Sequence, residues 1–181
     1  MSKLRFSTAQ QVVDAFAVLK AEIADDHLEM SPVTFVEQLA QSGRMGAALG
    51  FCALLLSRHD AVKWLCQSLR QLRVKYDSKD ETLLSLAENW AQTPSEKTRQ
   101  AAFKAAMASG FGTPAAWAAA ATGWTGGSLS ENQDFPVPPP AHMTGQAVKT
   151  SLLLALSEVP LKQRPEAMAK VLQQGLAYAE S

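Results

Sequence analysis

Apolar residues recur along most of the chain every three or four positions, which is the spacing of one face of an α-helix. In the clearest stretch this stripe consists of Val62, Leu65, Leu69, Leu72 and Tyr76. No stretch alternates apolar and polar residues with the enrichment in β-branched side chains that is typical of strands. The pattern therefore predicts an all-α protein, an irregular bundle of about eight or nine helices arranged as antiparallel hairpins.

Capping and turn residues divide this pattern into separate helices. Ser31, Thr93 and Thr113 each precede a proline, which suits the first position of a helix behind a capping hydroxyl. Gly110 is a natural helix end, because glycine readily adopts the left-handed conformation found there. The helix that begins near Thr144 is apolar almost all round, which predicts a central position. The expected helices cover roughly residues 9–24, 32–43, 45–56, 59–76, 81–92 and 94–110, followed by helices that begin at 114 and near 144 and by one over 166–178.

One long segment, residues 123–140, has no helical pattern. Glycines occur near its start and four prolines near its end. Clustered prolines favour an extended path with few hydrogen-bond donors, and such a path belongs on the surface. We expect residues 125–142 to cross the helical body as a strap, with Pro136–Pro140 against the surface near Trp117 or Trp124.

The composition is that of one globular domain spanning residues 1–181. Hydrophobic residues make up 47% of the chain and charged residues 19%, so a core can form without disulfides or metal. Seventeen basic residues balance seventeen acidic ones, and this neutrality argues against binding to nucleic acid or to an anionic membrane. The longest apolar run, Met45–Leu56, is too short to span a bilayer, which needs about 20 residues.

Candidate chemistry is sparse. Cys52 and Cys66 do not form a disulfide framework, so we expect buried, unlinked thiols and a cytoplasmic location. Residues 1–17 lack the uninterrupted apolar stretch of a signal peptide. The histidines lie far apart, and no nucleophile-elbow, phosphate-loop or dinucleotide motif occurs. Ser128 follows two glycines without a neighbouring histidine, so no catalytic residue, cofactor or metal is expected.

Two features of the predicted helix 59–76 leave alternatives open. Lys63 and Arg70 share one face, which suits a phosphate or an acidic partner, but a solvated flank is the simpler interpretation for a neutral chain. Trp64 lies on the side opposite to the core stripe. Either this helix is buried on two sides, or Trp64 is a surface anchor.

Trp117 and Trp124 are seven residues apart and share a helix face that is rich in alanine. Either they fill gaps between close helices, or they form an aromatic platform for the protein's own prolines or for a partner. Between residues 105 and 148 the charged residues are Glu131 and Asp134 alone, and a weakly charged exposed surface is typical of a protein contact. The predicted partner-binding residues are Trp64, Trp117, Trp124, Gly126, Gly127, Leu129, Phe135, Val137 and Pro138.

Six short motifs follow one another along the chain. They are AVKWLC at 61–66, AENW at 87–90, TPAAW at 113–117, WTGGSL at 124–129, PVPPP at 136–140 and TGQAV at 144–148. The series resembles an uncharacterised family of small bacterial proteins associated with type VI secretion gene clusters. The resemblance covers roughly Ser57 to the C-terminus and assigns no catalytic residue. It implies an accessory protein in the cytoplasm of a Gram-negative bacterium, an adaptor or co-chaperone that helps an effector assemble with its chaperone or a spike-tip protein.

Two other classes of function stay open. An immunity protein would bind and inhibit a cognate toxin, although the even charge of this chain argues mildly against the charged surface such proteins use. An enzyme would need a polar cleft, and the candidate acids and bases form no recognisable constellation. Self-association is compatible with the expected apolar surface, whereas nucleic-acid and membrane partners are not expected.

Overall fold

The computed structural model describes residues 5–23, 27–72, 75–130 and 134–181. Within these residues all regular structure is helical, which confirms the predicted all-α fold. The helices are α1 (Ala9–Ala15), α2 (Lys20–Ile23), α3 (Pro32–Gln41), α4 (Met45–Leu55), α5 (Arg58–Gln71), α6 (Ser78–Gln92), α7 (Glu96–Ser109), α8 (Pro114–Gly123), α9 (Met143–Glu158) and α10 (Arg164–Glu180). A short 3-10 turn, Ala17–Leu19, joins α1 to α2.

The first predicted helix is divided into α1 and α2. Phe16 ends α1 with a non-helical backbone (φ −130°, ψ 82°), and its ring meets that of Phe6 edge-on with 6.3 Å between the centroids. The amides of Ala9 and Gln10 donate hydrogen bonds to carbonyls of the segment that precedes α3. Tertiary contacts therefore override a continuous helical pattern. Residue 24, which the prediction included, lies outside the described residues.

Local capping determines where several other helices begin. The predicted caps Ser31 and Thr113 each accept a backbone hydrogen bond at the start of α3 and α8. The start expected at Thr93 is instead at Ser95, because Ser95 and Thr98 form a reciprocal capping box. The other end of α7 is a left-handed glycine, as predicted.

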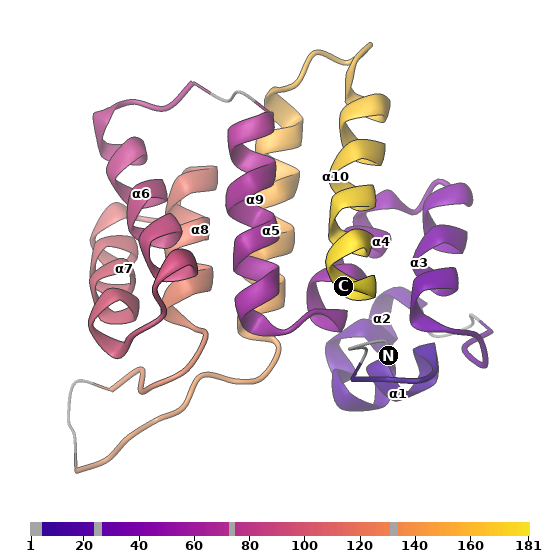
Figure 1. Ribbon diagram of the computed structural model, residues 1–181, viewed down its shortest axis with the longest axis horizontal. Helices are drawn as coiled ribbons and strands as arrows, with labels where there is room; N and C mark the ends of the chain where they lie inside the picture. The colour runs from indigo at the N-terminus through magenta and orange to yellow at the C-terminus, as the bar shows by residue number, and fades with distance from the viewer. Residues whose placement is uncertain (1–4, 24–26, 73–74, 131–133) are drawn as a thin grey trace.

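The helices form two groups around a central pair. α5 and α9 lie side by side in the middle, α6, α7 and α8 pack on one side, and α10, α4 and α3 lie on the other (Figure 1). α9 contacts α8, α4, α5 and α10, which confirms the predicted central position of this apolar helix. α9 and α10 run in opposite directions, and α1 and α2 lie at one end of the bundle (Figure 1).

The core extends through both groups. α4 is buried from Ala48 to Leu55, and in α8 every residue except Trp117 is buried. Trp64 is 0% exposed, and its indole Nε1 donates to the carbonyl of Val171 in α10 at 2.8 Å. Of the two interpretations of Trp64, burial on two sides is therefore correct, and the surface anchor is wrong because α10 covers the ring.

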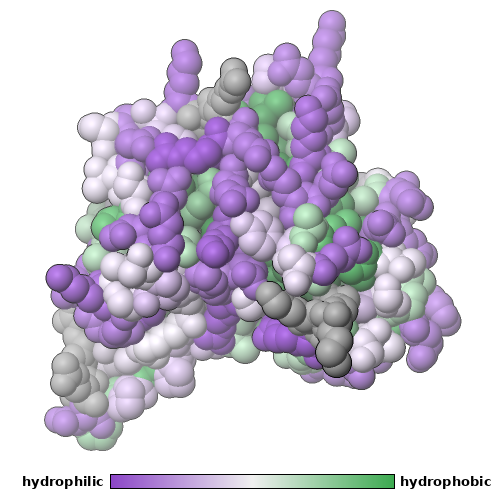
Figure 2. Space-filling view, viewed as in Figure 1, coloured by the Kyte–Doolittle hydropathy of each residue, from purple (hydrophilic) through white to green (hydrophobic). Residues whose placement is uncertain are grey.

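Both cysteines are buried and unlinked, as predicted. Burial raises the pKa of Cys52 and of Cys66 to about 12, so both thiols stay protonated near neutral pH. Among the described residues, no helix has the length and apolar character needed to cross a membrane. The face seen in Figure 2 is largely hydrophilic, with apolar residues in small patches.

The segment between α8 and α9 leaves the helical body and does not cross it. Its described parts, residues 124–130 and 134–142, contain neither helix nor strand and project beyond the ends of α7 and α8 (Figure 1). Pro138 is exposed, although Pro139 is buried. The described parts thus correct the expected strap, because only the base of this segment lies against a helix. We refer to residues 124–130 and 134–142 together as the loop.

Candidate functional site

A cleft of about 990 Å³ lies between one face of α7 and the base of the loop. The helix supplies one wall and both arms of the loop supply the other. The residues that shape it include Arg99, Phe103, Lys104 and Met107 from α7, and residues 127–130 and Pro136 from the loop. A cleft of this volume suits a peptide segment or a small ligand.

Hydrogen bonds between its two arms fix the base of the loop. The hydroxyl of Ser128 accepts from the amide of Ser130 at 3.0 Å and from the amide of Val137 at 2.9 Å. The amide of Leu129 donates to the carbonyl of Val137 at 2.7 Å. The hydroxyl of Ser128 therefore serves to join the outgoing arm to the returning arm beside the cleft.

Arg99 anchors the root of the loop to α7. Its side chain is 4% exposed, donates to Glu96 at 2.6 and 2.7 Å, and also donates to the carbonyl of Gly123. The hydrogen bonds from Arg99 lower the pKa of the Glu96 carboxyl. Gly127 has a φ of 66° and passes so near the guanidinium that a Cβ would collide with it. Both facts require glycine at this position.

Exposed apolar side chains are concentrated around this cleft. Met107 on α7 is 55% exposed, and Phe135 and Val137 on the loop are 72% and 51% exposed. The one other exposed large hydrophobic side chain of the described residues is Leu161, between α9 and α10. Apolar residues also appear at the projecting lower-left end of the molecule in Figure 2. The loop and α7 together thus present an unusual apolar surface.

Trp117 and Trp124 belong to a separate, half-buried aromatic cluster. Their ring centroids are 6.2 Å apart, and Phe111 lies 5.4 Å from Trp117 and 6.2 Å from Trp124. The carbonyl of Trp124 accepts a hydrogen bond of 2.9 Å from Thr144 Oγ1, which ties the start of the loop to α9. Phe111 packs against both tryptophans, so the cluster is complete within this chain and lies where the loop begins.

The predicted partner-binding residues fall into two sets. Gly127 and Leu129 line the cleft, and Phe135, Val137 and Pro138 are exposed next to it in the chain. The others, Gly126, Trp64, Trp117 and Trp124, do not line it. The structure also adds the wall from α7, which sequence reasoning missed because a methionine on a solvated helix face gives no signal until the loop is seen beside it.

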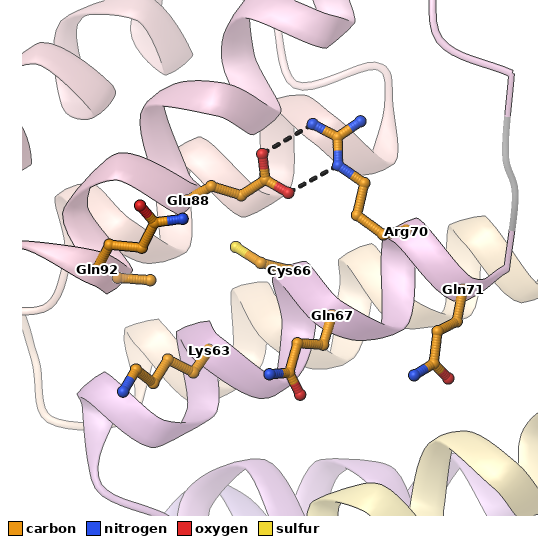
Figure 3. A pocket seen from close by; sticks show the side chains of 8 residues that line it. Lys63, Cys66, Gln67, Arg70, Gln71, Glu88 and Gln92 are labelled. Carbon is orange, nitrogen blue, oxygen red and sulfur yellow. Dashed lines mark hydrogen bonds and ion pairs between the residues drawn. The ribbon is translucent and has the colours of Figure 1, made fainter.

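A smaller groove of about 370 Å³ lies between α5 and α6 (Figure 3). Arg70 joins the two helices with two hydrogen bonds to Glu88, both of 2.7 Å, and two to Glu81, of 2.6 and 2.9 Å. These bonds raise the pKa of Arg70 and lower that of Glu81. Two carboxylates neutralise the charge of Arg70, so Lys63 is the remaining cation of the predicted basic face. This face therefore fits a solvated flank better than a phosphate site.

The chain belongs to the family of unknown function DUF6931, whose model matches residues 35–179. The matched region contains the cleft, the loop and the groove between α5 and α6. No curated protein and no solved structure matches the chain. Within the described part of the chain, no group of three or more histidine, cysteine, aspartate or glutamate residues is placed to hold a metal ion.

Proposed function

We propose that this protein is a non-enzymatic adaptor that binds a protein partner in the cleft between α7 and the loop. The proposed partner is an effector, an effector chaperone or a spike-tip protein of a type VI secretion system. The adaptor would act as a co-chaperone in the bacterial cytoplasm while the effector is loaded. The secretion context rests on the resemblance of the sequence motifs, and the place of contact rests on the cleft.

The observation that supports a protein partner is the apolar rim of the cleft. Three of the four exposed large hydrophobic side chains of the described chain are Met107, Phe135 and Val137. Covering a side chain of this size with a partner removes apolar surface from water, which contributes about 1.5–3 kcal/mol when burial is complete. A rim of this kind is typical of surfaces that bind proteins.

The polar groups of the cleft indicate the charge of the bound segment. Lys104 forms no ion pair with any described residue, whereas the charge of Arg99 is matched by Glu96. One unpaired cation within an apolar rim favours a segment that carries apolar side chains and an acidic residue. We therefore expect the partner to present such a segment.

Affinity capture from the native bacterium tests this proposal. The intact protein should recover a secretion effector, its chaperone or a spike-tip protein. Met107→Glu places a carboxylate on the α7 wall of the cleft, and Val137→Glu places one on the exposed loop beside Pro136, which lines the cleft. Each substitution should reduce recovery at least about tenfold, which corresponds to 1.4 kcal/mol. Leu161→Glu is the matched control, because it places the same charge at an exposed apolar residue that does not line the cleft.

Other outcomes would point elsewhere. Recovery of no secretion component, together with normal secretion after deletion of the gene, would overturn the proposal. If deletion instead makes cells sensitive to sister cells, the protein is an immunity protein that neutralises a toxin. Normal partner binding by both cleft variants would leave an adaptor whose contact surface lies outside the cleft.

A further inference from the structure

A small cavity of about 60 Å³ lies at the root of the loop, with walls different from those of the cleft. It is formed where the end of α4, the start of α5 and the start of α9 meet, at the lower end of the bundle in Figure 1, and residues before α1 complete it. A water molecule occupies roughly 30 Å³ of liquid. The cavity therefore has room for one small chemical group and excludes a whole peptide or nucleotide.

Two arginines line this cavity without a carboxylate between them. Arg5 Nη2 donates to the carbonyls of Leu54 and Leu56 at 3.2 and 3.0 Å, and Arg58 Nη1 donates to the carbonyl of Thr125 at 2.9 Å. Neither guanidinium forms an ion pair with a described residue. The pKa of Arg5 is lowered, first by burial and then by the positive charge of Arg58. The two cations are thus close enough to repel each other.

The start of α9 adds to this positive potential. Thr144 and Gly145 line the cavity, and their amides precede the first intrahelical hydrogen bond, which Gln146 donates to the carbonyl of His142. The side chain of His142 does not cap the helix. The free N–H groups and the dipole of a 16-residue helix therefore favour a negative charge at the same place.

From this arrangement we infer that the cavity binds a single oxyanion group, that of phosphate or of a carboxylate. Guanidinium groups donate paired hydrogen bonds to such oxygens and hold them with more geometric specificity than lysine does. A bound oxyanion removes the repulsion between Arg5 and Arg58. Because Arg58 also holds the carbonyl of Thr125, occupancy of the cavity stabilises the root of the loop. This inference is independent of the proposed adaptor function.

Titration of the purified full-length chain tests the inference. Inorganic phosphate and, separately, acetate are added at constant ionic strength while the arginine Nε–H and backbone amide signals are followed by NMR. We expect the signals of Arg5, Arg58, Thr144 and Gly145 to shift together along a saturable curve with one of these two probes. Saturation by phosphate identifies a phosphate site, and saturation by acetate alone identifies a site for a carboxylate.

Matched variants separate a site from general charge screening. Arg58→Gln should remove the saturable shift, and Arg58→Lys should keep the charge but weaken binding several-fold because the paired geometry is lost. Lys63→Gln removes one positive charge further along α5 and should bind like the parent chain. The inference is overturned if neither probe saturates, if Arg58→Lys and Arg58→Gln bind as the parent does, or if Lys63→Gln weakens binding equally.

Discussion

On the side of the bundle formed by α4, α5 and α10, large buried side chains interlock. On the side of α7, α8 and the loop, buried alanines fill the face of α8, its aromatic rings are only half-buried, and hydrogen bonds hold the loop. Gly175 of α10 shows the first case, since a Cβ there would lie 2.8 Å from Cys52 Sγ and 2.8 Å from the Trp64 ring. Ser128 shows the second, because its hydroxyl joins the two arms of the loop. On the first side, packing of large side chains at this distance leaves no room for an added methyl group.

The difference assigns separate tasks to the two sides. Substitutions on the α4–α5–α10 side should change the free energy of unfolding strongly, because cavities or overlaps there are not relieved. Substitutions at the cleft should change partner binding more than stability, since Met107, Phe135 and Val137 are already exposed. Binding residues on loops that a rigid scaffold positions are a common arrangement in proteins.

The largest effect is expected for Trp64→Ala. Removal of a fully buried indole leaves a cavity and removes the hydrogen bond from the indole to the carbonyl of Val171. The free energy of unfolding should therefore fall by about 3–5 kcal/mol. Trp117→Ala removes a half-buried ring and should cost less, roughly 1–3 kcal/mol. Urea unfolding followed by circular dichroism measures both values. Equal losses would mean that the two sides of the bundle are packed equally tightly.

An intermediate effect is expected for Gly175→Ala. The added Cβ overlaps Cys52 and Trp64, and overpacking of this kind costs about 1–3 kcal/mol. Gly46→Ala is the control, because Gly46 lies in α4 with open space around it and alanine favours helix by about 1 kcal/mol. Thermal unfolding should therefore shift in opposite directions for the two variants. A stabilised Gly175→Ala variant would show that α10 moves aside easily.

A smaller effect is expected for Ser128→Ala on the loop side. The change removes the acceptor for the amides of Ser130 and Val137 and should cost about 1 kcal/mol or less, because these groups are accessible to water. Hydrogen exchange at Val137 should accelerate while exchange at Val171 in the core stays unchanged. Faster exchange at both amides would mean that the loop base contributes to the stability of the whole bundle.

Much of the fold follows from local pattern. The helical spacing and the caps at Ser31 and Thr113 identify most helices, because these signals act within one turn. The break at Phe16 was not predicted, since it depends on a contact with Phe6 and on hydrogen bonds to a later segment. The burial of Trp64 stayed open for the same reason, because the helix that covers it is more than 100 residues away.

The candidate site was predictable in part. The low charge of residues 105–148 indicated a contact surface, and Gly127, Leu129 and Val137 do lie at the cleft or beside it. The sequence did not indicate that α7 forms the opposite wall, because α7 carries no distinctive apolar stripe. The path of the loop was also missed, since bonds between its own arms at Ser128 replace contacts with the helical body.

The smallest effect concerns Arg70, which joins α5 to α6 across the groove between them (Figure 3). The Arg70 and Glu81 side chains are 39% and 48% exposed, so Arg70→Gln should cost less than about 1 kcal/mol at neutral pH. Because Arg70 lowers the pKa of Glu81 in the folded protein, this stabilisation is present above the pKa of an unfolded glutamate and is lost as the pH falls through the lowered value. The parent chain and Arg70→Gln should therefore converge in stability at acidic pH, as urea unfolding at neutral and acidic pH would show. Lys170→Gln breaks an ion pair within α10 alone and controls for the loss of one surface charge. An equal difference in the free energy of unfolding between the parent chain and Arg70→Gln at both pH values would show that Arg70 acts by packing and not through its carboxylate partners.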